Sequence, residues 1–282
     1  MIQAEELLKL GQQLLKDRGI PSHVLDARIL LATTLNLSQK YFLPNIEISN
    51  SDQVKFLDLI KTRGKGKPIS RILSYRGFWD SEFYINSSTL DPRPDSEVLV
   101  SSAIELAKSI SEEKLSVLEL GVGSGCILLS ILKEVSNSFG VGVDISYEAI
   151  KVAQKNSNRL NLENRVRFIV SNWTNSLNTK FNLIISNPPY IKSSEIQYLQ
   201  KEVKNHDPLI ALDGGNDGLS CYKLIFKNID SYMTSESFLL FEIEGNRSDE
   251  LIKISKTKPL NLFCKQKDLS GKMRCLIFHK KK

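Results

Sequence analysis

The chain has 282 residues, of which 41% are apolar and 25% are charged, and this balance excludes an intrinsically disordered protein. Lys and Arg number 38 against 32 Asp and Glu, so the formal charge of +6 is mild, and its spread along the chain favours a solvated surface over an acidic or RNA-rich partner. No apolar run approaches the roughly 20 residues that cross a membrane, and the N-terminus does not resemble a signal peptide. These features predict a cytoplasmic protein with no membrane partner.

The cysteines give no indication of a metal or redox site. Cys126, Cys221, Cys264 and Cys275 lie far apart in sequence, without a short paired spacing or a neighbouring pair of histidines. Zinc sites and redox pairs depend on such spacings. We therefore expect no metal.

The N-terminal part of the chain, residues 1–72, is predicted to be a small helical domain. Leucines at helical spacing over Leu7–Leu15 indicate a first helix, which Gly19-Ile20-Pro21 ends. Ser22 is placed to cap a second helix, and a third is expected to end at Gly64.

Residues 73–90 are predicted to form a linker between domains. Aromatic side chains on both sides of Asp80-Ser81-Glu82 indicate a β-hairpin. The prolines of Pro92–Asp95 then make a rigid extended segment that leads into a helix at about 96–109. A larger domain is expected to occupy residues 91–282.

In this larger domain, short buried strands alternate with helices. Such alternation predicts an α/β fold with a mostly parallel sheet and helices on both faces. Strands are expected at 117–120, 139–144, 166–170, 181–186, 238–243 and 275–278, with helices at about 126–135 and through 149–153.

A glycine-rich turn follows the first of these strands. Glycines let the backbone approach a ligand closely where a strand passes into a helix. Their G-x-G-x-G spacing differs from the dinucleotide fingerprint, and the acid before them can take the ammonium of an amino-acid-bearing cofactor. The alternative is a tight structural turn. The predicted cofactor-binding residues here are Glu119, Gly121, Val122, Gly123, Ser124 and Gly125.

Two further positions complete a nucleoside site. Asp144 ends the second strand, where a carboxylate can accept hydrogen bonds from both ribose hydroxyls, although by itself it could cap the next helix. Asn172-Trp173 follow the third strand and offer an adenine a hydrogen-bonding edge and an apolar face. Alone, such a Trp is more often a packing residue.

The segment Asn187-Pro188-Pro189-Tyr190 follows the fourth strand, where open α/β sheets bind ligands. The prolines fix the backbone and leave carbonyls that only accept hydrogen bonds. If Asn187 Oδ1 and the Pro188 carbonyl each accept one N–H, an amide nitrogen is held with its lone pair toward a methyl group. Tyr190 is predicted to stack on the planar substrate and to ease positive charge on nitrogen. Alignment and electrostatics then provide the catalysis.

This ordered set of motifs resembles class I S-adenosylmethionine-dependent methyltransferases that act on planar nitrogens. It is most similar to the release factor glutamine methyltransferases, the PrmC/HemK family, over nearly the whole chain. Further segments that carry the resemblance are Tyr75–Trp79, Thr89–Glu97, Glu202-Val203, Asp207–Leu212 and Gly214–Leu219.

The resemblance implies a Rossmann-like domain with a mostly parallel seven-stranded sheet, preceded by a substrate-recognition helical bundle and a hairpin. It implies that S-adenosylmethionine is the methyl donor, with S-adenosylhomocysteine as product. The implied partner is a class 1 peptide chain release factor, methylated on the glutamine of its Gly-Gly-Gln motif. By carry-over, Gly121–Gly125, Asp144, Trp173 and Asn187 bind the donor, and Asn187–Tyr190 hold the glutamine. A monomer without a stable nucleic-acid partner is expected.

The chain departs from the family pattern at several positions. Val122 replaces a frequent Thr, Asn172 replaces the usual Asp, Asp207 stands for a Glu, and Glu242–Arg247 only approximates a Glu-Ile-Gly segment.

Two other hypotheses for the function remain open. A methyltransferase for adenine amino groups would use the same loop on a flipped base, and would be expected to have a strongly basic face or an added recognition domain. The third hypothesis for the function is a protein that binds its ligands without catalysing a reaction.

Overall fold

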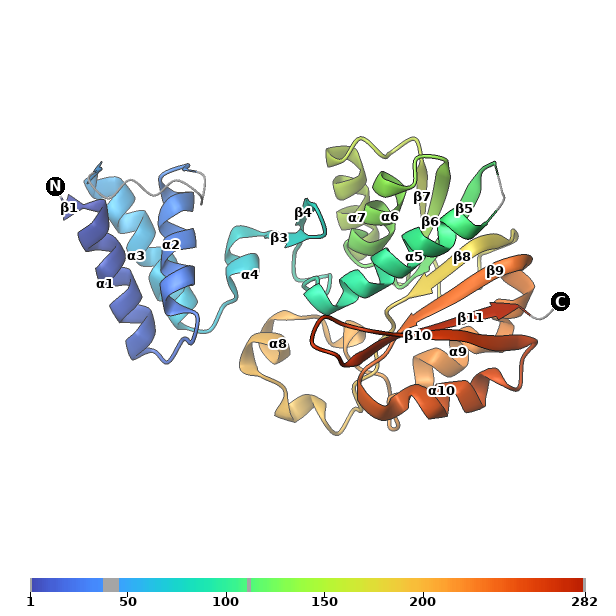
Figure 1. Ribbon diagram of the computed structural model, residues 1–282. Helices are drawn as coiled ribbons and strands as arrows, with labels where there is room; N and C mark the ends of the chain where they lie inside the picture. The colour runs from blue at the N-terminus through green and yellow to red at the C-terminus, as the bar shows by residue number, and fades with distance from the viewer. Residues whose placement is uncertain (1, 38–45, 111–112, 281–282) are drawn as a thin grey trace. The chain divides into compact units, whose positions relative to one another are not determined.

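The computed structural model describes residues 2–37, 46–110 and 113–280, which fold into two compact units (Figure 1). The smaller unit comprises Met1–Ser74 together with Gln200–His206, and the larger comprises Tyr75–Leu199 and Asp207–Lys282. Among the described residues, no helix is long and apolar enough to cross a membrane.

The smaller unit is helical, as the leucine spacing predicts. Its core contains the apolar faces of the first three helices, with Leu7, Leu30 and Phe56 fully buried. A short antiparallel pair, Ile2–Gln3 (β1) with Glu47–Ile48 (β2), was not predicted, because strands of two residues leave no periodic signal. The helices are α1 (Ala4–Asp17), α2 (His23–Thr34), α3 (Asn50–Gly64), α4 (Ile69–Leu73) and α8 (Lys201–His206).

A buried arginine joins three of these helices. Arg63 of α3 donates from Nε to Asp26 Oδ2 of α2 and from Nη1 to Glu202 Oε1 of α8, each over 2.6 Å. Asp26 also accepts from the Ser22 hydroxyl at 2.7 Å. Ser22 occupies the N-cap position of α2 but makes no side-chain cap, so the predicted cap is wrong. Its hydroxyl donates to the carboxylate that binds Arg63.

The larger unit begins with the predicted hairpin, which is confirmed as β3 (Tyr75–Phe78) paired with β4 (Ser81–Tyr84). Its turn lies at Trp79 and Asp80, one residue earlier than expected, with Trp79 in the left-handed region at φ 54°. A 3-10 turn, η1 (Pro94–Ser96), then leads into α5 (Glu97–Ser109).

The described residues of this unit form a seven-stranded sheet in the order β10-β11-β9-β8-β5-β6-β7. Five adjacent strands, β9 to β7, are parallel, and β11 and β10 are antiparallel at one edge. This confirms the mostly parallel sheet. The strands are β5 (Leu115–Leu120), β6 (Ser138–Asp144), β7 (Val166–Val170), β8 (Phe181–Ser186), β9 (Met233–Glu242), β10 (Leu260–Lys267) and β11 (Met273–Lys280).

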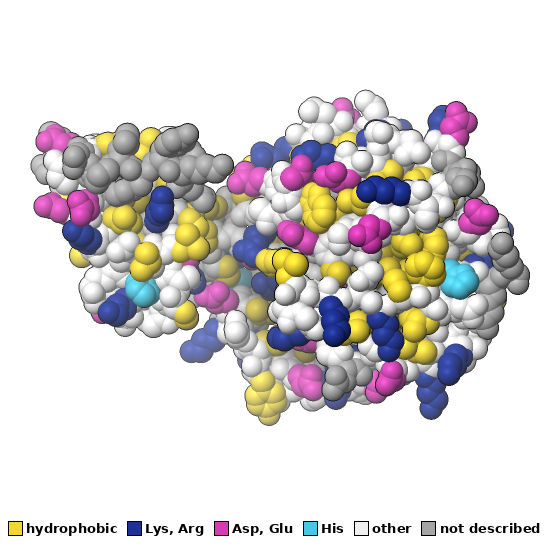
Figure 2. All heavy atoms as spheres, viewed as in Figure 1, with side chains coloured by type: hydrophobic (Ala, Val, Ile, Leu, Met, Phe, Trp, Pro, Cys, Tyr) yellow, Lys and Arg dark blue, Asp and Glu magenta, His cyan; other side chains and the backbone are white. Residues whose placement is uncertain are grey.

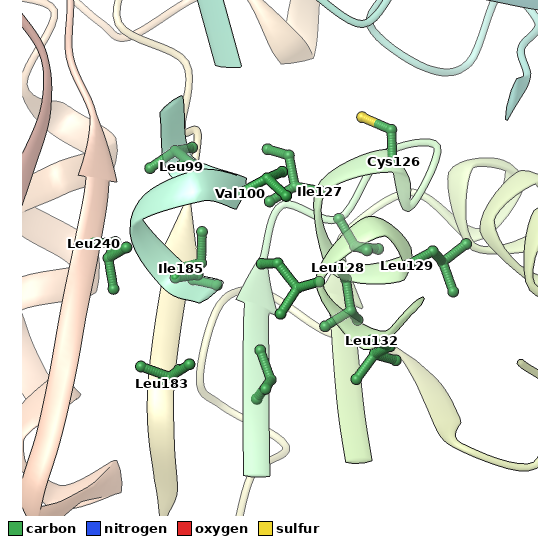
Figure 3. Close-up of a cluster of buried hydrophobic side chains, with 14 of the residues drawn as sticks. Leu99, Val100, Cys126, Ile127, Leu128, Leu129, Leu132, Leu183, Ile185 and Leu240 are labelled. Carbon is green, nitrogen blue, oxygen red and sulfur yellow. The ribbon is translucent and has the colours of Figure 1, made fainter. Parts of the chain in front are cut away.

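Helices cover both faces of the sheet (Figure 1), so successive residues of β8 enter different cores. Leu183 and Ile185 pack with α5 and α6, as Figure 3 shows, whereas Ile184 belongs to the cluster that contains residues of α9 and α10. The strand is therefore buried at every position. The remaining elements are α6 (Cys126–Glu134), α7 (Tyr147–Arg159), η2 (Ile196–Tyr198), η3 (Leu209–Ala211), α9 (Ser220–Asn228), η4 (Ile229–Tyr232), η5 (Gly245–Arg247) and α10 (Ser248–Ser255).

Candidate active site

A cavity of about 640 Å³ lies in the larger unit, lined by residues that follow β5, β6, β7 and β8. Its volume falls within the roughly 300–1,000 Å³ of small-molecule sites. Of the predicted site residues, those that line it are Glu119, Gly121, Val122, Gly123, Ser124, Asp144, Asn172, Trp173, Asn187 and Pro189. The structure thus brings together motifs that are far apart in sequence.

The glycine turn is fixed to the end of β6. The backbone N–H groups of Gly121 and Val122 both donate to the Val143 carbonyl, over 2.8 and 2.9 Å. Gly121 and Gly123 have φ of 75° and 53°, values that favour glycine. A Cβ added to Gly123 would meet no atom within 4 Å, so this backbone borders open space that a ligand can fill.

Gly125 differs from the other two glycines because it does not line the cavity. At φ 80°, a Cβ there would lie 3.1 Å from Leu129 Cδ1 and 3.3 Å from the Ala153 Cβ. The glycine therefore lets α6 and α7 approach each other beneath the turn. Its predicted contact with the cofactor stays a prediction.

Asp144 links the glycine turn to the next helix. Its Oδ2 accepts from the Gly123 N–H and its Oδ1 from the Ser146 N–H, each at 2.9 Å. Burial raises the pKa of its carboxyl group, and these backbone hydrogen bonds oppose that rise. The N-cap of α7 is Ser146, which accepts from the Ala149 N–H, so Asp144 is not the cap. Its carboxylate lines the cavity.

Glu119 lines the cavity and is only 2% exposed. Its Oε2 accepts from the Leu128 N–H at 2.9 Å. Burial raises the pKa of Glu119 well above its usual range, and the nearby charge of Asp144 adds to the rise. A cationic ligand would favour the ionised carboxylate, so these two acids suit a ligand that carries an ammonium group.

Trp173 contributes an aromatic side chain to the cavity wall, and its contact with an adenine stays a prediction. Trp173 lines the cavity and lies against the glycine turn, its Cζ3 atom 3.6 Å from the position of an added Cβ on Gly121. Its backbone is left-handed at φ 50°. Asn172 lines the same part of the cavity.

The Asn-Pro-Pro-Tyr loop contributes only part of its length to the cavity. Asn187 and Pro189 line it, whereas Pro188 and Tyr190 do not. Tyr190 is half-buried against the core cluster beneath α9, and burial raises the pKa of its hydroxyl. Its stacking on a substrate and the acceptor role of the Pro188 carbonyl both stay predictions.

Two further segments line the cavity, and the sequence motifs did not predict this position for either of them. One is the stretch before α5, with Thr89, Pro92, Arg93 and Ser96, and the other is Leu209–Ala211. Arg93 Nη2 donates to Asp207 Oδ2 at 2.5 Å, which ties the first segment to the start of the second. Both belong to motifs that carried the family resemblance, but no single residue type in them indicated a ligand.

The residues present fit S-adenosylmethionine. Two acids line the cavity and can accept hydrogen bonds from an ammonium and a ribose diol, Trp173 offers a flat apolar face, and Gly123 leaves its side-chain space open. Over the described ranges, no group of three or more His, Cys, Asp or Glu side chains is placed to hold a metal ion.

Comparisons with known proteins agree with this arrangement. Residues 6–73 match the PrmC N-terminal domain, and residues 95–205 match the Methyltransferase small domain. The release factor glutamine methyltransferase of Agrobacterium fabrum is 35% identical over 94% of this chain and 93% of its own length. The chain belongs to the release factor glutamine methyltransferase family. A second member, from Rhodospirillum rubrum, is 36% identical over 96% of this chain and 83% of its own length.

Solved structures show the same fold beyond the family. The hMettl16 catalytic domain in complex with a MAT2A 3′UTR hairpin aligns with a TM-score of 0.57 at 11% identity, over 83% of this chain and 84% of that one. The ribosomal protein L11 methylase of Lactobacillus delbrueckii aligns with a TM-score of 0.50 at 17% identity, over 67% of this chain and 81% of that one. At such low sequence identities, the structural similarity shows only a shared fold, that of the methyltransferase domain.

Proposed function

We propose that this chain methylates the side-chain amide nitrogen of the glutamine in the Gly-Gly-Gln motif of class 1 peptide chain release factors. Membership of the family supports this substrate. The observation that supports the chemistry is the position of Asn187, at the end of β8 and at the wall of a cavity that fits the methyl donor.

An amide nitrogen is a poor nucleophile because its lone pair is delocalised. Asn187 Nδ2 donates to Ser96 Oγ at 3.3 Å, which leaves Oδ1 as the group that accepts from an incoming N–H. The Pro188 carbonyl is the second acceptor, and the two together hold the glutamine nitrogen with its lone pair toward the donor.

S-adenosylmethionine supplies an electrophilic methyl group when it is bound. The new N–C bond forms as the S–C bond breaks, and the methylated nitrogen then loses its proton to water, so no strong base is required. The two acceptors favour this reaction because they stabilise the N–H groups as they become more positive. Tyr190 is proposed to face the planar amide.

The remaining assignments belong to the same proposal. Glu119 binds the donor's ammonium, Asp144 its ribose, and Asn172 with Trp173 its adenine. Residues 1–72 recognise the release factor, 73–90 are the linker and 91–282 the catalytic domain of a monomer acting in the cytoplasm. On the face shown in Figure 2, basic side chains are interspersed with acidic and apolar ones, which suits a protein substrate better than a nucleic acid.

A labelling assay tests the proposal. Purified chain with methyl-labelled donor is expected to label a class 1 release factor and to leave its Gly-Gly-Ala variant unlabelled. Transfer RNA and DNA serve as competing substrates in parallel reactions. Label in the nucleic acid, or equal label in both release factors, would overturn the assignment.

A further inference from the structure

Glu242 lies beside Asn187 because of the register of two parallel strands. Ser186 of β8 pairs with Phe241 of β9, and the next residues along the two strands are Asn187 and Glu242. Glu242 is 2% exposed, and Ser96 beside it is 3% exposed. A buried acid is therefore the neighbour of Asn187, which lines the donor cavity.

Glu242, Ser96 and Asn187 form one cluster of polar side chains. Ser96 and the Asn187 amide lower the pKa of the Glu242 carboxyl group, as donors to its ionised form do, and so oppose the rise that burial causes. Asn187 Nδ2 also donates to Ser96 Oγ at 3.3 Å. The other carboxyl oxygen, Oε2, has no hydrogen-bond partner among the described residues.

This arrangement decides which end of the Asn187 amide faces the cavity. A carboxylate accepts hydrogen bonds and cannot donate them, so it binds the NH2 end and rejects the oxygen end. If the amide were rotated by half a turn, its NH2 group would face the N–H groups of the incoming glutamine. The donor groups would then oppose each other, and no acceptor would hold the substrate.

We propose that Glu242 is a positioning residue that fixes the Asn187 amide with Oδ1 toward the substrate nitrogen. It acts through Asn187 and does not touch the methyl donor. Its catalytic consequence rests on the proposed function, whereas its control of the amide orientation is a property of the folded chain alone.

Glu242 changes its charge near pH 7, so its effect on Asn187 can be followed by varying the pH. Burial raises the pKa of its carboxyl group to about 7, against the opposing effects of Ser96 and Arg274. Arg274 stays cationic in this range and is paired with Asp95 at 2.6 Å. The other titratable groups that face Glu242 keep raised pKa values and stay neutral near pH 7; they are Tyr190, Tyr222, Cys126 and Cys275.

Two substitutions test the role. Glu242→Leu removes the acceptor and is expected to lower kcat about tenfold or more, as for loss of a group that aligns a transition state, with donor affinity within about twofold of wild type. Glu242→Gln keeps an acceptor oxygen and is expected to retain more activity than Glu242→Leu. Glu236→Leu, an exposed acid on the same strand, is the control for an acid-to-leucine change in β9.

A spectroscopic readout separates this role from a structural one. In the wild-type chain labelled with ¹⁵N-asparagine, the Asn187 side-chain NH2 signal is expected to shift with pH, with a midpoint near 7. In Glu242→Leu the shift should disappear. The Asn187→Ala chain identifies the signal by its loss.

The outcomes are distinct. If the wild-type chain does not methylate the release factor, the proposed function is rejected. The NMR titration would still determine the orientation of the Asn187 amide. An Asn187 signal with the same pH dependence in wild type and Glu242→Leu would overturn the positioning role. So would a Glu242→Leu enzyme with wild-type kcat.

Discussion

Asp144 Oδ2 accepts a hydrogen bond from the Gly123 N–H over 2.9 Å, so the end of β6 holds the middle of the glycine turn in place. The same carboxylate lines the cavity. It shapes the turn, and in the proposed function it also binds a ribose.

Replacing Asp144 is expected to weaken donor binding. Asp144→Ala should raise the Kd for S-adenosylhomocysteine about 10- to 100-fold, because a hydrogen bond to a charged group contributes roughly 1.5–3 kcal/mol. Isothermal titration calorimetry measures the change, and Glu148→Gln, an exposed acid at the start of α7, is the control. Unchanged affinity would reject the ribose role.

Asn187 is expected to affect turnover and not the fold. Asn187→Ala should lower kcat about 100-fold or more, as for loss of a key transition-state hydrogen bond. Single-turnover transfer to the release factor, with circular dichroism for the fold, provides the measurement. Asn261→Ala on the exposed edge of β10 should behave as wild type. Near-normal turnover of Asn187→Ala would remove this residue from the mechanism.

The glycines of the turn should respond differently to the same substitution. Gly123→Ala and Gly125→Ala both place a Cβ on left-handed backbone, at a cost of about 1–3 kcal/mol each. Gly125→Ala should cost more, because its Cβ also crowds Leu129 and Ala153, whereas Gly123→Ala should mainly weaken donor binding.

Urea denaturation and donor titration of these variants separate the two effects. Gly271→Ala, at φ 81° with no atom within 4 Å of the added Cβ, is the matched control for backbone strain away from the cavity. Equal losses of stability in Gly123→Ala and Gly125→Ala would contradict the packing role of Gly125.

The raised pKa of Glu242 predicts how stability changes with pH. Its value of about 7 exceeds the ordinary 4.5, so between these pH values the native state binds more protons than the unfolded state. This group therefore makes the free energy of unfolding fall as pH rises, by about 1.4 kcal/mol per pH unit.

Glu242→Leu lacks that dependence. Relative to wild type, its free energy of unfolding should rise by about 3 kcal/mol between pH 5 and pH 8, whatever the absolute difference at pH 5. Urea denaturation at four pH values measures the slope. A difference that does not change with pH would show that Glu242 ionises normally.

In the smaller unit, the Asp26–Arg63 ion pair is expected to be essential for stability. Both side chains are buried, so Asp26→Ala leaves Arg63 without the partner of its Nε and should cost about 3–5 kcal/mol. Hydrogen exchange of α2 and α3 measures this loss. Asp58→Ala, an exposed acid of α3, is the control. Unaltered protection in Asp26→Ala would contradict the prediction.

The order of strands and helices in the larger unit could be predicted because its central strands are buried on both faces. Residues 181–186 are mainly apolar and buried at every position, and β8 has those same bounds. The edge strand β10 was not predicted, since over Leu260–Lys267 only Leu260 is buried and the other side chains alternate between exposed and half-buried. An edge strand has too little buried surface to give a strong apolar pattern.

The cavity-lining residues of the motifs could be predicted because each lies near the end of a strand that the sequence reveals. Glu242 could not be given a role in the same way. Its relation to Asn187 depends on the pairing of β8 with β9, and Ser96 reaches both from a segment 91 positions before Asn187. Only the folded sheet brings such groups together.

The sheet order has a consequence for how this kind of enzyme can change. Most residues proposed to recognise the methyl donor lie at the ends of β5, β6 and β7, whereas Asn187, proposed to contact both donor and substrate, and Glu242 lie at the ends of β8 and β9. Mutations on the β9 side can therefore alter which nitrogen is accepted while the nucleoside pocket keeps its shape. Under the proposed function, substrate preference and donor affinity can therefore change largely independently.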